Sequence, residues 1–356
     1  MRTTVLRLTL IVASLVTALR ADVAVLLAEP YGGFGSVNPT GHAAIFLNRV
    51  CAASPTRLRR CGADELGVVI SRYHKIAEYD WLAIPLLPYL YAVESPREVP
   101  EFADAQKVLS LRDSYRRRYL SEVVSDSASG QTPEGNWVQL VGAAYDRKIF
   151  AFQIETTEKQ DEEFIREFNA RPNRSRFNLL FRNCADLVRG AVNLYYRGAI
   201  KRSIVADAGI TTPKQVANSL VRYARKHPEL QFAAYIIPQI PGSRPPSSHV
   251  RGVLESLIKS KKYAVPLVAA NLWITPGLTA GYFAKGRFNP SRYAVTVCGP
   301  FEVEQRVFLA VKSSPQESAQ THDIAHATVA TPATVGTDSI NKLIDHNPID
   351  DLAAVK

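Results

Sequence analysis

Cysteine and the common cofactor-binding motifs are scarce in this sequence of 356 residues. It has four cysteines, and it contains neither a C-x-x-C pair nor an H-E-x-x-H segment, so the usual zinc patterns are missing. Two histidines with helical spacing, in HDIAH (322–326), fall in a polar tail. The glycine-rich stretch YGGFGSVNPTG (31–41) precedes a strand and opens no helix, which argues against a phosphate loop. We therefore predict no metal and no cofactor.

The basic residues form no continuous run, although the net charge is +10. They are spread over short segments such as TRLRR, SYRRRYL and IKSKK, and no basic helix carries interleaved aromatic residues. Nucleic acid is therefore not an expected partner. Solvated surface charge is the commonest interpretation, and a basic surface also suits anionic lipid or cell-wall polymer. A hydrophobic content of 46% is enough for a substantial core.

The N-terminus predicts export to the cell envelope. A short basic start is followed by the apolar run LTLIVASLVTA (8–18), and Ala18 and Ala21 are candidate cleavage sites. Residues 1–21 would then be a signal peptide. The alternative is an uncleaved N-terminal anchor, because apolar residues resume at 23–28, although Arg20 and Asp22 interrupt the run. In an exported protein Cys51 and Cys61 can form a disulfide, which leaves Cys184 and Cys298 without close partners.

A second apolar segment, 263–284, carries no charge over 22 residues. It is long enough to span a bilayer, and a buried hairpin turning at TPG is the equal alternative. The rest predicts an α+β fold, a small antiparallel sheet packed against helices. We expect a catalytic domain (22–200), a helical extension (201–262), a strand-like segment (285–313) and a largely disordered tail (314–356).

The expected elements follow from periodicity and capping residues. Strands are predicted at 42–50 and 66–76, as a pair turning near YDRK within 136–157, and at 232–237. Helices are predicted at 104–124, 158–171, 184–196, 213–227 and 249–262. Residues 51–65 are expected to be a loop, and 79–93 to be a buried irregular segment or a broken helix, because they contain two prolines.

Cys184 stands at the predicted start of a helix, with Asn183 as its N-cap. The helix dipole and the neighbouring Arg182 favour a thiolate, and the Asn183 amide could face a developing oxyanion. The competing interpretation is a small, inert core residue. A thiol nucleophile needs a base, and His42 and His74 are the histidines placed on predicted strands. His42 opens its strand directly after the NPTG loop.

Together TGHAAIFL (40–47) and FNLLFRNCADLV (177–188) resemble the circularly permuted papain-like thiol enzymes, the NlpC-type and lecithin:retinol acyltransferase-like proteins. Gly41 and His42 fit that family's histidine strand, and Phe177, Asn178, Asn183 and Cys184 fit its cysteine run. The resemblance covers about Gly35 to Tyr196. It implies that Cys184 is the nucleophile and His42 the base, within a permuted papain-like core.

The family's third polar residue is not fixed by this sequence. Ser71, His74 and Glu65 compete for it, and we favour Ser71 or His74. The resemblance implies acyl transfer from an amide or ester, and we lean towards an amidase or peptidase acting on cell-wall peptides. A lipid acyl substrate competes, because of the 263–284 segment. The alternative function is a non-catalytic, membrane-associated structural or lipid-binding protein on the same fold.

Overall fold

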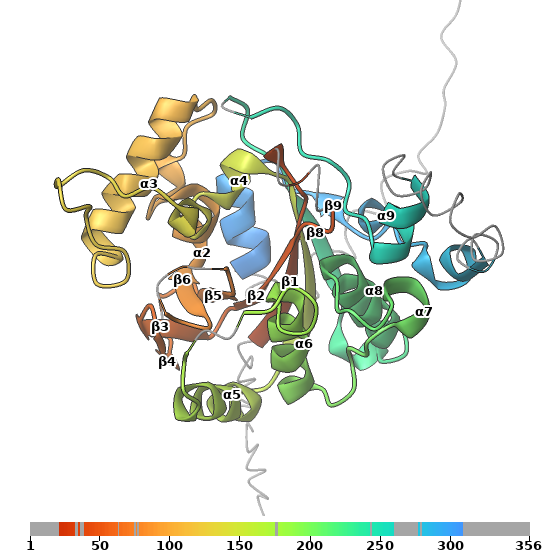
Figure 1. The fold of residues 1–356 in the computed structure, drawn as a ribbon. Coiled ribbons are helices and arrows are strands. Elements are labelled where there is room, and N and C mark those ends of the chain that lie inside the picture. The colour runs from red at the N-terminus through yellow and green to blue at the C-terminus, as the bar shows by residue number, and fades with distance from the viewer. Residues whose placement is uncertain are drawn as a thin grey trace, which may run out of the picture. The chain divides into compact units, whose positions relative to one another are not determined.

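The computed structural model describes residues 21–308, apart from 33–34, 36–38, 63, 75, 77, 175–176, 243, 260–276 and 278–279. Its centre is a seven-stranded sheet with the order β6-β5-β2-β1-β7-β8-β9 (Figure 1). All neighbouring strands are antiparallel except β8 and β9. The strands are β1 (Ala21–Ala28), β2 (His42–Leu47), β5 (Val68–Ser71), β6 (Leu82–Pro85), β7 (Ile149–Thr156), β8 (Ala233–Ile237) and β9 (Val295–Thr296).

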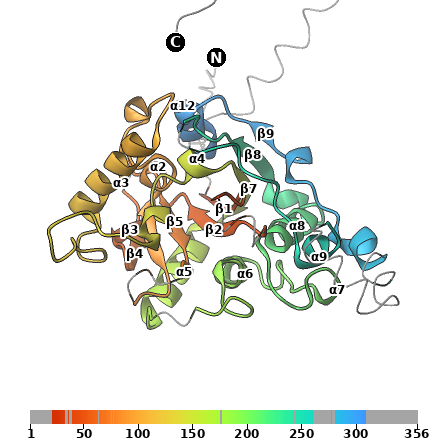
Figure 2. The same ribbon diagram turned by 45° about the horizontal axis from the view of Figure 1, so that its top comes forward.

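Helices cover both faces of the sheet. One side carries α5 (Glu158–Ala170), α6 (Cys184–Tyr195) and α8 (Pro213–Ala224), and the other carries α2 (Leu86–Tyr91), α3 (Ala105–Tyr119) and α4 (Ala143–Asp146) (Figure 2). Alternate residues of β1 enter the two cores: Val23, Val25 and Leu27 face α6 and α8, whereas Ala24 and Leu26 face α2. A central strand covered by helices on both faces needs apolar residues on both, as β1 has. The sheet with helices on either side confirms the expected α+β fold.

β1 decides one of the alternatives for the N-terminus. Residues 23–28 of the strand are buried in the middle of the sheet and pair with both β2 and β7. The apolar run 23–28 is therefore a core strand and not the second half of an N-terminal anchor. The signal peptide expected at 1–21 lies almost entirely outside the described residues, which begin at Ala21.

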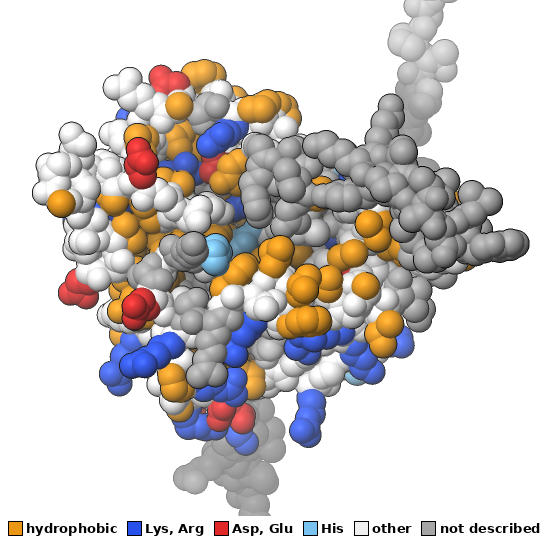
Figure 3. Space-filling view, viewed as in Figure 1, with side chains coloured by type: hydrophobic (Ala, Val, Ile, Leu, Met, Phe, Trp, Pro, Cys, Tyr) orange, Lys and Arg blue, Asp and Glu red, His pale blue; other side chains and the backbone are white. Residues whose placement is uncertain are grey.

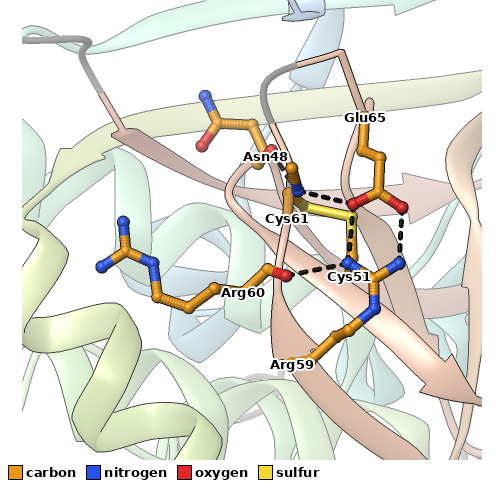
Figure 4. The surroundings of a disulfide bond; sticks show 7 residues. Asn48, Cys51, Arg59, Arg60, Cys61 and Glu65 are labelled. Carbon is orange, nitrogen blue, oxygen red and sulfur yellow. Dashed lines mark hydrogen bonds and ion pairs between the residues drawn. A yellow bond between two sulfur atoms is a disulfide. The ribbon is translucent and has the colours of Figure 1, made fainter.

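The segment 51–65, expected to be a loop, forms most of a hairpin. β3 (Val50–Ser54) pairs with β4 (Arg57–Arg60), and Cys51 and Cys61 form a disulfide across its base (Figure 4). The prediction missed it because Pro55 and three arginines obscure the alternation. Only Leu58 of β4 is buried, so the strand has almost no apolar face.

The segment 136–157 contains one strand, where two were expected. Residues 136–139 form a short 3-10 helix, α4 follows at Ala143–Asp146, and only β7 enters the sheet. Gly142 has a φ of +73°, and this left-handed residue starts α4. The proline-containing segment 79–93 becomes β6 followed by α2, with all of α2 buried.

The C-terminal part of the described chain agrees with expectation in part. The region 201–262 contains α7 (Ile204–Asp207), α8 and α9 (Val253–Lys259), and the strand expected at 232–237 is β8, which joins the sheet. Within its described residues, 285–308, the expected strand-like segment has one two-residue strand, β9, and several short helical turns that include α12 (Pro300–Glu302). No helix within the described residues is long and apolar enough to span a membrane. Most of 263–284, and the whole tail 314–356, fall outside those residues.

Candidate active site

The candidate site lies where β5 separates from β2. The pairing of these strands ends at Ala44 and Ser71. The first residue of α6, Cys184, lies at this point, and the backbone N–H of Ala43 contacts its thiol. Ala43 is the residue after His42. The structure therefore brings the two segments of the resemblance, 142 residues apart, to one place.

A buried ion pair holds the start of α6 against β5. Arg72, just after the strand, donates to the Asn183 carbonyl at 3.0 Å and pairs with Asp80 at 2.5 Å. Asn183 is the N-cap as predicted, since its side-chain oxygen accepts from the Asp186 N–H. Its amide nitrogen donates to the carbonyls of Leu179 and Thr211. The Asn183 amide is therefore engaged within the fold and does not serve an oxyanion.

The thiol of Cys184 is half-buried, and burial raises its pKa. The N–H groups of Ala43 and Ala185 and the charges of Arg147 and Arg72 oppose this effect without outweighing it. The expectation of a lowered thiol pKa is therefore wrong, because desolvation of the thiolate costs more than the helix start returns. Arg182, expected to assist, is exposed to solvent, which screens its charge. At neutral pH the resting group is a thiol.

His42 begins β2 and is 7% exposed. Its ring stacks on Tyr73, with the centroids 4.3 Å apart and the planes 8° from parallel. Burial, followed by the charge of Arg147, holds the His42 pKa well below the usual 6.5. Its Nε2 has no hydrogen-bond partner within the described part of the chain. His42 is therefore neutral at pH 7, with a ring nitrogen available.

The three candidates for the third polar residue lie in different surroundings. Ser71 is buried opposite Ala44, two residues along β2 from His42, and its Oγ has no partner among the residues described. His74 is exposed and its ring lies 5.0 Å from that of Phe177. Glu65 is bound by Arg59 and the Gly62 N–H beside the disulfide, at the Leu47 end of β2 (Figure 4). Five residues of strand separate that end from His42, roughly 17 Å, so Glu65 cannot reach the imidazole.

Aromatic and basic side chains that the sequence reading missed surround His42. Tyr73 and Tyr89 are buried, and their hydroxyl groups are close enough to interact with each other. Tyr89 comes from α2 and is close enough to Cys184 for the two groups to interact electrostatically. Arg147 lies just before β7, and its guanidinium packs 4.9 Å from the centre of the Tyr31 ring. The only sequence signal was an arginine directly before an apolar strand.

An exposed apolar turn precedes Cys184. Leu179, Leu180 and Phe181 are 47–57% exposed, and the Asn178 side chain caps their turn by accepting from the N–H groups of Leu180 and Phe181. Histidine side chains are visible near the middle of the face in Figure 3, with apolar side chains gathered beside them. This turn gives Asn178 of the cysteine run a structural role.

One group of potential metal ligands occurs among the described residues: Cys51, Cys61 and Glu65, within 4.8 Å of one another. The two sulfurs are bonded to each other, so neither is a thiolate ligand while the disulfide stands. The HDIAH segment lies outside the described range.

No family model matches the sequence, and no curated protein matches it. The crystal structure of the type VI secretion system effector TseH is similar over 62% of this chain and 94% of that chain. The identity is 10% and the TM-score is 0.30, values too low to support a conclusion about fold or function.

Proposed function

We propose that this protein is a thiol enzyme that transfers an acyl group through Cys184, with His42 as its base. The observation that carries the proposal is the contact between the Cys184 thiol and the N–H of Ala43, the residue next to His42. A thiol at a helix start, close to the backbone of the strand that carries a buried and neutral imidazole, is an arrangement suited to nucleophilic catalysis. It also agrees with the resemblance to the permuted papain-like enzymes.

In the proposed reaction the Cys184 sulfur attacks the carbonyl carbon of an amide or ester, and its proton passes to His42. The carbonyl π bond opens to an oxyanion, and backbone N–H groups at the start of α6 are its available donors. His42 then returns the proton to the leaving nitrogen or oxygen as the bond to the carbonyl carbon breaks. Water attacks the resulting thioester, releasing the acid and restoring the thiol.

An acyl-enzyme trapping experiment tests the proposal. The native protein is incubated with p-nitrophenyl acetate, quenched in acid and mapped by mass spectrometry. We expect acetylation of Cys184, lost in Cys184→Ala and strongly reduced in His42→Ala. Cys298, an exposed free cysteine, is the control within the same chain. If Cys184 is acetylated no faster than Cys298 and His42→Ala changes nothing, the thiol-enzyme proposal fails.

For the substrate we favour an amide of cell-wall type, acted on in the cell envelope. The export-like N-terminus and the basic charge support this choice. Cell fractionation tests the location, and release of new amino groups from isolated cell-wall peptides tests the chemistry. Cys184→Ala is the control for the chemistry and should release no amino groups. If the native protein is not found in the envelope and releases no amino groups, or if Cys184→Ala releases them equally well, this substrate is excluded.

A lipid acyl substrate, or lipid binding without catalysis, is the second candidate. The exposed turn of Leu179, Leu180 and Phe181 beside Cys184 favours it, because apolar side chains at a site entrance suit an acyl chain. Leu180→Asp tests it with a series of p-nitrophenyl esters of increasing chain length. A lipid site predicts a loss confined to the long esters, whereas equal rates for all esters would favour the peptide substrate.

A further inference from the structure

Arg147 is a buried guanidinium without a counter-charge. It is 4% exposed, and no hydrogen bond or ion pair reaches it from the described residues; its Nε lacks any partner. The other buried arginines of that part of the chain, Arg72, Arg112 and Arg116, each pair with an aspartate at 2.5–2.7 Å. Arg147 therefore differs from the arginines that serve the fold.

The neighbouring carboxylate does not neutralise Arg147. Asp146 accepts from Arg112 at 2.6 Å and from Arg244 at 3.1 Å, so both of its oxygens are engaged. Arg147 itself contacts the face of the Tyr31 ring. An ionised group kept out of water without an opposite charge costs several kcal/mol, so a buried arginine is normally paired.

The strand register places Arg147 on the face of the sheet that carries His42. Ala28 of β1 is opposite His42 on one side and Ile149 on the other. Arg147 is two residues before Ile149, so its side chain leaves the sheet in the same direction. His42 Nε2 and Arg147 Nε are buried there without partners among the residues described, and the hydroxyls of Tyr73 and Tyr89, which interact with each other, are buried on the same face. Unpaired donors and acceptors next to one cation form a polar site.

We propose that Arg147 binds an oxyanion of the substrate, a carboxylate or a phosphate near the carbonyl that Cys184 attacks. This inference rests on the proposed function, since it names the substrate class of the same site. The planar guanidinium fork matches a carboxylate or phosphate in two hydrogen bonds, and the tyrosine hydroxyls can add further donors. An anionic ligand would supply the negative charge that Arg147 lacks among its neighbours in direct contact.

Alkylation of Cys184 by two matched reagents tests this. Iodoacetate and iodoacetamide both transfer a methylene group to sulfur: the S–C bond forms, the C–I bond breaks and iodide leaves with the electron pair, while the thiol proton goes to base. They differ in that iodoacetate carries a carboxylate and iodoacetamide carries a neutral amide. The ratio of the two rates therefore measures anion preference separately from the reactivity of the thiol. Cys298 gives the ratio for a thiol outside the site.

We expect the iodoacetate preference at Cys184 to exceed that at Cys298 and to fall on the order of tenfold in Arg147→Gln, the loss of one charge-assisted hydrogen-bonded contact. Arg147→Lys should keep part of it. Arg244→Gln is the matched control, because Arg244 lies over the same Tyr31 ring but is paired with Asp146. If inorganic phosphate slows alkylation of Cys184 in the native protein but not in Arg147→Gln, the site binds phosphate. If succinate slows it and phosphate does not, the site binds a carboxylate.

The outcomes separate this inference from the proposed function. If Cys184 reacts and its rate ratio is the same in Arg147→Gln, the oxyanion site is refuted while the nucleophile stands. If Cys184 resists both reagents, the nucleophile is refuted, and a rise in melting temperature with succinate or phosphate in the native protein but not in Arg147→Gln would still establish the anion site. A large loss of thermal stability in Arg147→Gln would instead assign Arg147 to the fold and overturn the inference.

Discussion

Truncating Asp80 should destabilise the fold at the point that positions Cys184. Asp80 pairs with Arg72 at 2.5 Å, and their side chains are 11% and 7% exposed. Arg72 also donates to the Asn183 carbonyl at the start of α6. In Asp80→Ala this guanidinium remains buried without its partner, which typically costs about 3–5 kcal/mol. The loss should appear as an earlier urea transition by far-ultraviolet circular dichroism, with an unchanged slope.

Glu65→Ala is the matched control, since it removes an equally short pair at the surface. Glu65 and Arg59 are also 2.5 Å apart, but their side chains are 40% and 45% exposed. The hydrogen bond from Arg59, and then that from Gly62, lower the Glu65 pKa to about 2. Solvent nevertheless screens such pairs, so the expected loss is only about 0.2–1 kcal/mol.

Two results decide whether burial controls the difference. If Asp80→Ala and Glu65→Ala unfold at the same urea concentration, the buried-pair reasoning is refuted. If the unpaired charge is the cause, the double variant Arg72→Met/Asp80→Leu should recover most of the loss, because neither charge is then left buried.

Further predictions concern the disulfide, the imidazole and the core. Cys51→Ala/Cys61→Ala should lose roughly 2–3 kcal/mol in the chain-entropy model, and reductant should reproduce this in the native protein, as measured by urea unfolding. Because the His42 pKa is lowered on folding, its contribution to stability is present above pH 6.5 and is lost as the pH falls towards the folded pKa. Melting temperatures should fall below pH 6.5 more steeply in the native protein than in His42→Gln, and parallel curves would contradict this. Phe164→Ala should lose about 3–5 kcal/mol, since its ring is 1% exposed between α5 and α6.

The parts of the fold predicted correctly are those fixed by local rules. The helices predicted to begin at 158 and 213 do so, because Thr157 caps α5 in a capping box and Thr212 caps α8. β2 is apolar after His42 and proves to be buried on both faces. The hairpin β3–β4 is held by the disulfide, and the turns of 136–146 are held by distant partners such as Arg112. Both were missed because the periodicity of a local sequence carries no information on such long-range contacts.

The site was predictable in part, for a similar reason. Cys184 at a helix start and His42 at a strand start follow from local sequence, and their proximity followed only from the resemblance. The direction of the Cys184 pKa shift could not be predicted from the sequence, because it depends on how much of the fold covers the sulfur. Arg147 could not be identified at all, since a guanidinium without a partner is recognised only once every possible partner has been located.

The charge of Arg147 links substrate binding to the proton transfer that a neutral thiol requires. Burial favours the uncharged forms of both Cys184 and His42, so attack must move a proton from sulfur to imidazole. Arg147 favours the thiolate but opposes the imidazolium, and thus helps one half of that step while hindering the other. An oxyanion bound to Arg147 would cancel both effects: His42 would become a stronger base, and the thiolate would lose part of its support. Anionic substrates should therefore shift the barrier from forming the imidazolium to forming the thiolate.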